Sequence, residues 1–580
     1  MQQNSKGVFL RLMGYLRPHF PTLLLALILV LAATAGNLLR PIIIGRAIDT
    51  ITSGGLFSTI VRFFLLYIGL LILATVCNMI QMLMLQKLGQ SIIFQLRQEI
   101  FTHIHKLSLR FFDITPVGRI VTRVTNDVET LNELFSTILV TMVKNVVLIL
   151  GYAGVMLFLQ WKLALLSFVL LPVVFLLTRL FTRVYRTTHR ITRTKVSALN
   201  TYLSENLSAM KLIQIFHREP EKRHEFSQRS EDLFRSNFRE IVVYGTFQPL
   251  IYFISIVSLA VVLGFGGRLV LGGTISIGTL YIFTSYVRSF FEPIQSLSDQ
   301  FGTLQAAMAA GEKIFTLLDE EPAIRNPEHP KPMPKPTLGR IEFDHVWFSY
   351  DGEEWVLRDV SFVIEPGQTA AFVGPTGAGK SSILNLIGRY YDIQKGRITI
   401  DGVDIRELDK DEIRRAVGQV QQDVFLFTGD IRSNIRLGNQ DISDQEIEAA
   451  AKFVNADGFI RKLEQGYETA VMERGSTLSA GQRQLLSFAR TLAFDPSILV
   501  MDEATANIDT ETEALIQDAM ERLMRDRTTI VVAHRLSTIQ HADRIMVIHK
   551  GKLREQGTHQ ELLAQNGIYK KLYDLQLREH

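Results

Sequence analysis

Hydrophobic residues form long unbroken stretches in the first half of the chain and only short runs in the second half. A helix needs roughly 20 apolar residues to cross about 30 Å of hydrocarbon, and six stretches have this length and composition. They lie at residues 20–44, 60–85, 134–159, 163–181, 243–271 and 275–291. Buried helices of a soluble protein would keep a polar stripe, and residues 23–35 have almost none. We therefore expect six membrane-spanning helices.

Lysine and arginine residues gather on one side of these predicted spans. The segment before the first span and the two long connections, between spans two and three and between spans four and five, are rich in both residues. Cytoplasmic loops of membrane proteins carry such an excess. We expect a multi-pass protein of the cytoplasmic (inner) membrane, embedded in the lipid bilayer, with both termini in the cytoplasm.

The two long basic connections have helical patterning of their own. Residues 86–109 and 182–216 contain few helix breakers, so we expect the spans to continue into the cytosol as helical rods. Proline and glycine at 113–119 predict the turn at one tip, and residues 208–211 are a weaker candidate for the other. We interpret the tips as docking on the second half of the chain, with solvated connectors as the alternative.

Four ionisable residues fall within or beside the predicted spans: Arg40, Lys144, Arg288 and Glu292. Ionisable residues inside a membrane are functional candidates. Structural explanations are equally open, because Arg40 could extend toward the interface and Arg288 could pair with Glu292 one helical turn later. None of the four is predicted to be a substrate ligand.

The composition changes after residue 319. Residues 320–338 are dense in proline, which favours an extended linker, and residues 339–580 alternate strand-like, helix-like and polar segments. The predicted fold class is therefore multi-domain, with an all-α six-helix transmembrane domain at 1–319 followed by an α/β domain. A formal net charge of +4 gives no argument for a nucleic-acid partner, and the single cysteine, Cys77, excludes an intrachain disulfide.

A phosphate-binding loop lies between the short apolar strand 370–373 and a helix that begins at residue 381. The glycines let backbone N–H groups close around phosphates, Lys380 reaches the β- and γ-phosphate oxygens, and the Ser381 hydroxyl is a Mg²⁺ ligand. The strand–loop–helix setting that this motif requires is present. The predicted nucleotide-binding residues here are Gly374, Pro375, Thr376, Gly377, Ala378, Gly379, Lys380, Ser381 and Ser382.

A second apolar strand, 498–501, ends in the acidic pair Asp502 and Glu503. Asp502 suits the Mg²⁺ shell, and Glu503 can orient and deprotonate the attacking water. Acidic residues often end strands, so the pair is informative because a phosphate loop lies upstream. Together the two motifs predict an ATP hydrolase that uses ATP and Mg²⁺.

With these motifs in place, the run from Leu478 through Ser479, Ala480 and Gly481 to Gln482 resembles the signature sequence of the ATP-binding cassette (ABC) family, and the resemblance covers essentially the whole chain. It implies that Gln422 senses Mg²⁺ and takes part in catalysis, and that His534 contacts the γ-phosphate. It further implies that Tyr350 stacks on adenine. Asp509 would lie in a loop, 506–509, that crosses between two nucleotide domains, and residues 473–475 would contact the loop tips.

The order of spans followed by one cassette resembles the multidrug and lipid exporter branch of this family. The resemblance implies a half-transporter that pairs with a second one, with each ATP held between one chain's phosphate loop and the other chain's signature. The predicted function is ATP-driven export of small amphipathic or lipophilic compounds of the multidrug type by alternating access. The alternatives are a lipid flippase of the same architecture and an ATP-gated channel or regulatory subunit.

Two positions depart from the family pattern. Ala480 stands where glycine is usual, and Asn507 replaces the more usual serine of the crossing loop. A Cβ at Ala480 should weaken the site built from this signature, whereas the catalytic residues of this chain are intact. We favour a heterodimer in which this chain is the catalytically competent subunit, with a symmetric homodimer that tolerates alanine as the alternative.

Overall fold

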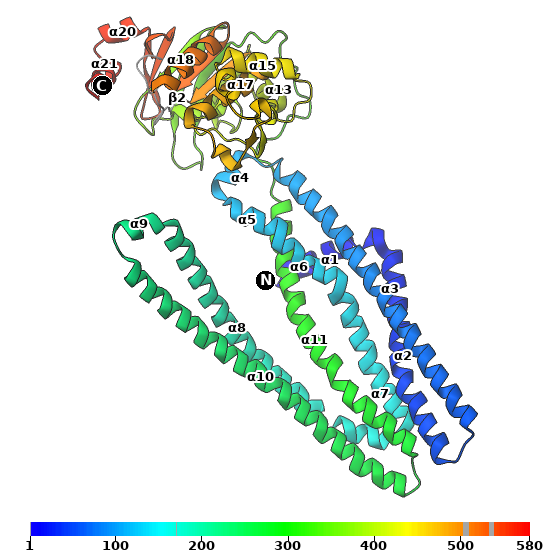
Figure 1. Cartoon of the computed structure of the whole chain (residues 1–580). Coiled ribbons are helices and arrows are strands. Elements are labelled where there is room, and N and C mark those ends of the chain that lie inside the picture. The colour runs from blue at the N-terminus through cyan, green and yellow to red at the C-terminus, as the bar shows by residue number, and fades with distance from the viewer. Residues whose placement is uncertain (1, 170, 503–509, 533–538, 580) are drawn as a thin grey trace. The chain divides into compact units, whose positions relative to one another are not determined.

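The computed structural model describes residues 2–169, 171–502, 510–532 and 539–579. Contacts divide the chain into two units (Figure 1). The helical unit contains Met1–His105 and Gly118–Glu320, and the sheet unit contains Lys106–Val117 and Glu321–His580.

In the described residues, the helical unit contains six long helices. They are α2 (Phe20–Thr52), α3 (Phe57–Ile104), α7 (Leu139–Phe168), α8 (Leu171–Ser208), α10 (Glu219–Leu271) and α11 (Ile277–Leu318). Shorter helices join them: α1 (Gln2–Gly14), α5 (Val117–Thr122), α6 (Val128–Glu133) and α9 (Met210–Ile215). Five predicted spans each lie on one long helix or its direct extension, and the span at 163–181 is divided between α7 and α8. The unit is a helical transmembrane domain.

Within the described residues, four helical segments are long and apolar enough to cross a membrane: Arg17–Thr52, Phe57–Ile104, Val117–Phe168 and Glu219–Leu271. Helices α8 and α11 fall outside this group for a physical reason. The apolar start of α8 is soon followed by Arg179 and Arg183, and α11 carries Arg288 and Glu292 among several hydroxyl side chains.

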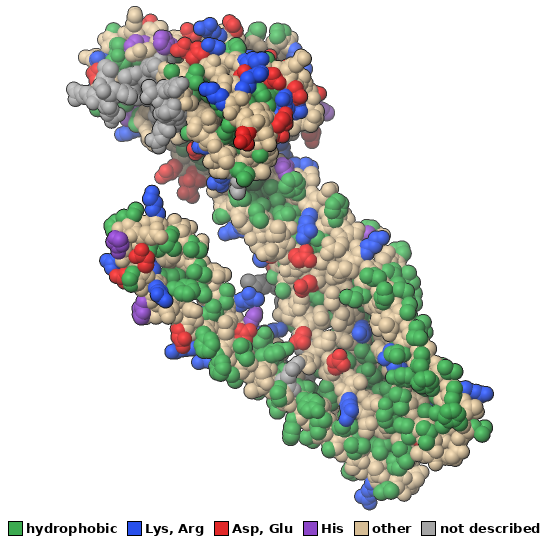
Figure 2. Space-filling model, viewed as in Figure 1, with side chains coloured by type: hydrophobic (Ala, Val, Ile, Leu, Met, Phe, Trp, Pro, Cys, Tyr) green, Lys and Arg blue, Asp and Glu red, His purple; other side chains and the backbone are tan. Residues whose placement is uncertain are grey.

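The surface of the helical unit exposes many large hydrophobic side chains. Figure 2 shows them gathered over α2 and α3. A water-soluble surface rarely exposes a continuous apolar patch of this extent, whereas a lipid-facing surface requires one. Examples, each more than 40% exposed, are Leu24, Leu25, Ile28, Phe64, Leu65, Ile72, Leu73, Met79, Met82 and Leu83.

The long helices extend beyond the predicted spans and break near the predicted tips. At the first tip, α4 (Leu109–Ile114) is separated from α5 by Thr115 and Pro116, as the proline predicted. At the second tip, Ala209 interrupts the helix between α8 and α9. The first tip belongs to the sheet unit, whereas α9 belongs to the helical unit.

The sheet unit has the α/β fold that the sequence predicted. Its six-stranded sheet has the order β12-β11-β3-β10-β9-β6, and every pairing is parallel except that of β11 with β12. The strands are β3 (Thr369–Val373), β6 (Val417–Val420), β9 (Ile498–Asp502), β10 (Thr528–Val532), β11 (Arg544–His549) and β12 (Lys552–Gly557). Strand β10 is buried along its whole length, as expected of a parallel strand covered on both faces.

An antiparallel sheet of order β2-β1-β4-β5 and several helices complete the sheet unit. The strands are β1 (Ile341–Phe348), β2 (Leu357–Ile364), β4 (Lys395–Ile400) and β5 (Val403–Asp404). The main helices are α12 (Lys380–Ile387), α13 (Lys410–Ala416), α14 (Ile431–Arg436), α15 (Asp444–Phe453), α17 (Ala480–Ala493) and α18 (Thr510–Met524). Two hydrophobic cores fill the space between these layers.

The proline-rich segment is extended and bound to the sheet unit. The Lys331 N–H donates to the carbonyl oxygen of Glu407 (2.8 Å), and the Lys331 ammonium pairs with the Glu407 carboxylate (2.8 Å). Met333 is buried, and its N–H donates to Glu412. Proline removes donors from such a segment, but the N–H groups of Lys331 and Met333 find partners here, so the segment is anchored at these residues.

Candidate functional site

The predicted phosphate loop begins where β3 ends and continues into α12. Gly374, Gly377 and Gly379 have φ values of 149°, 78° and 105°, a region that residues with a Cβ rarely adopt. At Gly374 an added Cβ would also collide with the carbonyl oxygen of Ile548. The loop therefore needs glycine for its conformation at three positions, and Pro375 and Thr376 are exposed at its rim.

Lys380 lies at the start of α12 and is only 6% exposed. Its ammonium donates to the carbonyl oxygens of Gly374 (2.7 Å) and Pro375 (3.1 Å), so it lies inside the curve of the loop. Burial lowers the pKa of Lys380, and the carboxylate of Asp502 acts in the opposite direction. The structure thus places the predicted lysine and the predicted acidic residue close together.

The sheet register explains this arrangement. Val532 of β10 pairs with Phe372 of β3 on one side and with Asp502 of β9 on the other. Because the strands are parallel, the loop after β3 and the acidic end of β9 emerge at the same edge of the sheet. Asp502 is half-buried and Ser381, one residue into α12, is exposed.

The polar groups of the loop, together with Lys380, Ser381 and Asp502, fit a nucleotide bound with Mg²⁺. The loop amides and the amino terminus of α12 favour anions, and the buried ammonium of Lys380 adds a cation inside the loop. Mg²⁺ prefers oxygen ligands, chiefly carboxylates and hydroxyls together with phosphate and water, and Asp502 and Ser381 offer two such groups. The chemistry of the donor set is that of a phosphate and magnesium site.

Tyr350 and Ser382 lie beside this loop. The Tyr350 hydroxyl and the buried Ser382 hydroxyl are 2.9 Å apart. Tyr350 is 37% exposed, and its ring makes edge-to-face contacts with Phe348 and Tyr391 at centroid distances of 4.7 and 4.9 Å. An exposed aromatic ring next to the phosphate loop is where an adenine-stacking residue would be needed, and that role stays a prediction.

The predicted signature forms the amino terminus of α17. The Ser479 hydroxyl accepts from the Gln482 N–H (3.2 Å), and the Gln482 side chain accepts from the Ser479 N–H (3.0 Å). This reciprocal cap orders the helix start. Ala480 is the first residue of the helix, has no positive φ and is exposed, whereas Gly481 is buried. Alanine therefore causes no backbone strain here, and its methyl group matters only to a molecule that approaches this helix end.

The remaining predicted residues fall in different places. Gln422 is exposed in the loop that follows β6. Glu503, Asp509 and His534 lie outside the described residues, as does Asn507.

One contact at this site was not predicted. The hydroxyl of Tyr391, a residue that is only 7% exposed, donates a hydrogen bond to the Asp113 carboxylate of α4. Burial raises the pKa of Tyr391, and the hydrogen bond to Asp113 raises it further. The first loop tip therefore docks on the sheet unit, as the sequence indicated, but no sequence motif singled out Tyr391.

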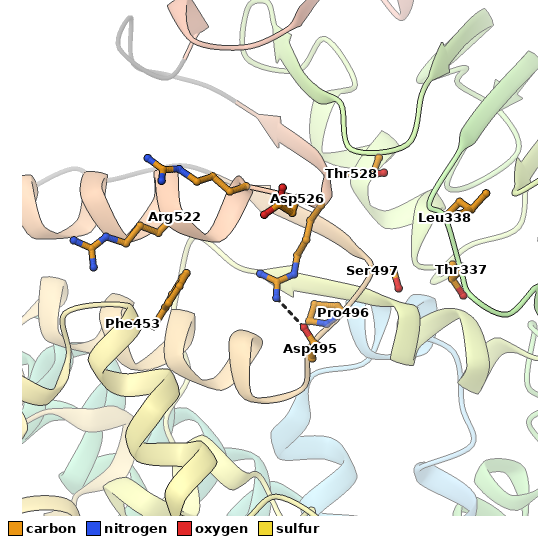
Figure 3. Close-up of a pocket in the computed structure, with 11 residues that line it drawn as sticks. Thr337, Leu338, Phe453, Asp495, Pro496, Ser497, Arg522, Asp526 and Thr528 are labelled. Carbon is orange, nitrogen blue, oxygen red and sulfur yellow. Dashed lines mark hydrogen bonds and ion pairs between the residues drawn. The ribbon is translucent and has the colours of Figure 1, made fainter.

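A separate cavity of about 580 Å³ lies elsewhere in the sheet unit (Figure 3). Its lining includes Ser497 and Thr528, at the amino-terminal ends of β9 and β10, and it contains an ion pair between Arg527 and Asp495 (2.7 Å). The phosphate loop lies at the carboxyl ends of the parallel strands, so this cavity is not the nucleotide site.

Comparisons with known proteins agree with this arrangement. Residues 23–294 match the family described as ABC transporter transmembrane region, and residues 357–506 match the family described as ABC transporter. A protein of Streptococcus pneumoniae, assigned as ABC transporter ATP-binding protein exp8, is 41% identical over 579 residues, which cover 99% of this chain and 98% of the relative.

Two further comparisons extend the match. An ATP-dependent lipid A-core flippase of Syntrophus aciditrophicus is 33% identical over 99% of this chain and 95% of the relative. The solved structure of a bacterial Atm1-family ABC exporter with ATP bound superposes with a TM-score of 0.80 at 28% identity, over 96% of this chain and 98% of the other.

The family properties follow from these matches. The ABC domain binds ATP with Mg²⁺ and hydrolyses ATP. ABC exporters dimerise and work in a membrane, so this multi-pass chain is a membrane protein that works as a dimer. The chain belongs to the ABC transporter family, as an exporter half-transporter in which a helical transmembrane domain is fused to an ATP-hydrolysing domain.

Proposed function

We propose that this protein exports amphipathic or lipophilic compounds across the cytoplasmic membrane by ATP-driven alternating access, with both termini in the cytoplasm. The observation that carries the proposal is the contact between Tyr391 and Asp113. It holds residues 106–117, the connection between α3 and α5, within the ATP-hydrolysing unit and beside Tyr350 of the nucleotide site. A change at the nucleotide site can thus shift the conformation of this connection, and through it the conformation of the membrane helices, as a pump requires.

At the ATP site we propose a separate role for each of the predicted residues. The loop amides and Lys380 hold the phosphates, and Ser381, Asp502 and Gln422 serve the Mg²⁺ shell. When bound, Mg²⁺ neutralises charge on the β- and γ-phosphate oxygens. Glu503 orients and deprotonates the attacking water.

Three further contacts belong to the same proposal. His534 contacts the γ-phosphate, Tyr350 stacks on adenine, and Asp509 takes part in the loop that faces the second nucleotide domain. Glu503→Gln tests the catalytic assignment: we expect retained ATP binding and abolished turnover. Unchanged hydrolysis would remove Glu503 from this role.

We further propose that the working dimer is a heterodimer. In this proposal the amino terminus of α17, formed by Ser479, Ala480, Gly481 and Gln482, faces the nucleotide held by the sister chain, where the exposed Ala480 methyl group hinders the closest approach. That sister site would bind ATP but turn over slowly. The purified chain alone, assayed in lipid nanodiscs, should show little substrate-stimulated ATP hydrolysis. Full stimulated activity from the single chain would establish the homodimer instead.

A lipid flippase is the second candidate, favoured by the relative named as a lipid A-core flippase. Proteoliposomes separate the two candidates. A pump for soluble amphipaths changes the amount of a fluorescent dye in the lumen upon addition of ATP, whereas a flippase changes the fraction of labelled lipid that an external quencher reaches. ATP-dependent lipid movement without dye movement would replace export by flipping.

A further inference from the structure

An open cavity of about 570 Å³ lies among the helices of the helical unit, and Arg288 and Glu292 on its wall are exposed. Helices α2, α3, α7 and α11 line it, and the four ionisable residues that the sequence placed within or beside the spans all meet there: Arg40, Lys144, Arg288 and Glu292. The two outermost of them, Arg40 on α2 and Glu292 on α11, are 252 residues apart in the chain. Convergence of this kind marks a binding site more strongly than any one of the residues does alone.

The charges in this cavity are not balanced by one another. Three side chains are cationic and one is a carboxylate. In the described part of the chain, the ion pair that Arg288 and Glu292 could have formed at one-turn spacing is not present, and neither Arg40 nor Lys144 has an ion-pair partner. The Nε of Arg40 is buried and has no hydrogen-bond partner.

The surroundings of Arg40 make this imbalance costly. Arg40 is half-buried on α2, within the predicted span 20–44. A cation in apolar surroundings is stabilised by an anion or by water. The unpartnered Nε of Arg40 and the three cations that line the cavity together favour an anionic molecule as their complement, and guanidinium groups match phosphate and carboxylate oxygens in geometry.

The rest of the lining has both polar and apolar character. Tyr67, Thr141, Tyr281 and Ser285 supply hydroxyl groups, whereas Ile44 and Leu148 supply apolar contact. The volume is within the range of sites for small organic ligands, about 300–1,000 Å³. It accommodates a polar head group and the first part of an attached hydrocarbon chain.

We propose that this cavity binds the anionic head group, a phosphate or a carboxylate, of an amphipathic molecule, with Arg40, Lys144 and Arg288 as its cationic ligands. The inference rests on the proposed export function, because it names the substrate class of that export. Glu292 lies one helical turn from Arg288 and repels an anion in the cavity. The negative charge of Glu292 therefore lowers the affinity of the cavity for the anionic head group and favours its release.

Removal of a cationic side chain from the cavity and removal of the Glu292 carboxylate should have opposite effects on the binding of an anionic amphipath. The full-length chain in nanodiscs, without ATP, is titrated with a fluorescent dansyl fatty acid and with the matching uncharged amide. Arg288→Gln and Lys144→Gln should each weaken binding of the acid about tenfold, equal to about 1.4 kcal/mol, whereas Glu292→Gln should tighten it severalfold. Arg46→Gln, an exposed arginine on α2 outside the cavity lining, should leave the affinity unchanged. A variant that misfolds cannot bind more tightly, so the Glu292 result keeps the test independent of folding.

Competition experiments distinguish the anionic head group of an amphipath from a free inorganic or small organic anion. A lysophospholipid with an anionic phosphate head should compete with the dansyl acid, whereas inorganic phosphate or acetate at millimolar concentration should not. Equal affinities in all variants, equal binding of the uncharged amide, or effective competition by inorganic phosphate would overturn the proposal. Because binding is measured without ATP, a failure of ATP-driven transport would leave this result standing and would overturn only the export function.

Discussion

The hydrogen bond from Tyr391 to Asp113 can be removed with little other change by Tyr391→Phe. The aromatic contacts to Phe348 and Tyr350 remain, and Asp113 is exposed, so the freed carboxylate is hydrated by water. A hydrogen bond to a charged group contributes about 1.5–3 kcal/mol. Because Asp113 is exposed, this bond should contribute a free energy at the lower end of that range, about 1.5 kcal/mol.

This free energy holds the first loop tip on the ATP-hydrolysing unit. Its loss should raise the population of undocked α4 about tenfold, because 1.4 kcal/mol corresponds to a factor of ten. Hydrogen–deuterium exchange of the full-length chain in nanodiscs measures this opening directly at residues 106–117. Exchange there should accelerate about tenfold in Tyr391→Phe, and substrate stimulation of ATP hydrolysis should fall while nucleotide binding persists.

Tyr390→Phe is the matched control. It removes the same hydroxyl group from the neighbouring residue, whose ring lies 5.0 Å from the Arg414 guanidinium. Exchange at residues 106–117 should equal that of the wild type. If Tyr391→Phe also exchanged at the wild-type rate, the contact would not hold the loop tip, and the coupling argument would fail.

Three further predictions concern the ATP-hydrolysing unit. Gly374→Ala should abolish ATP binding and lower the unfolding temperature of the domain, because its φ of 149° and the close carbonyl group exclude a Cβ; Gly458→Ala, with open space around it, should do neither. Asp404→Asn should destabilise the domain by about 2 kcal/mol at pH 7. Burial acts to raise the pKa of Asp404, but hydrogen bonds and charge from Arg406 outweigh it and the net pKa is lowered. The stabilisation is thus fully present above the unfolded pKa of about 3.9 and is lost as the pH falls through the folded pKa, so the stability difference between variant and wild type should begin to shrink below about pH 3.9 and vanish below the folded pKa; a constant difference would refute this ion pair as the cause. Ala480→Gly should increase ATP turnover of the assembled dimer, and an unchanged rate would show that the methyl group does not limit the site.

Local motifs were predictable from the sequence because their chemistry is contained in a few adjacent residues. The glycines around Lys380 specify a loop whose φ values only glycine adopts readily. Ser479 and Gln482 specify the start of α17 by a cap that spans four residues. Four of the predicted spans coincide with helical segments that are long and apolar enough to cross a membrane, since an apolar run of this length has few other stable environments.

Contacts between distant segments were not predictable in the same way. Asp113 and Tyr391 are 278 residues apart, and neither stands in a pattern that indicates the other. The helical period suggested a pair between Arg288 and Glu292, whereas the tertiary fold directs both residues to a cavity shared with Arg40 and Lys144. One-turn spacing permits an ion pair but does not require it when a larger polar environment is available.

The central claim is that ATP hydrolysis drives an amphipathic compound across the membrane against its gradient. Inside-out membrane vesicles that contain the protein, and its sister chain if one co-purifies, test it directly through the luminal concentration of a fluorescent anionic amphipath after addition of ATP. We predict accumulation above the external concentration, absent when Glu503→Gln replaces the wild type. Equal concentrations on both sides in the presence of ATP would show a channel and would contradict the pump.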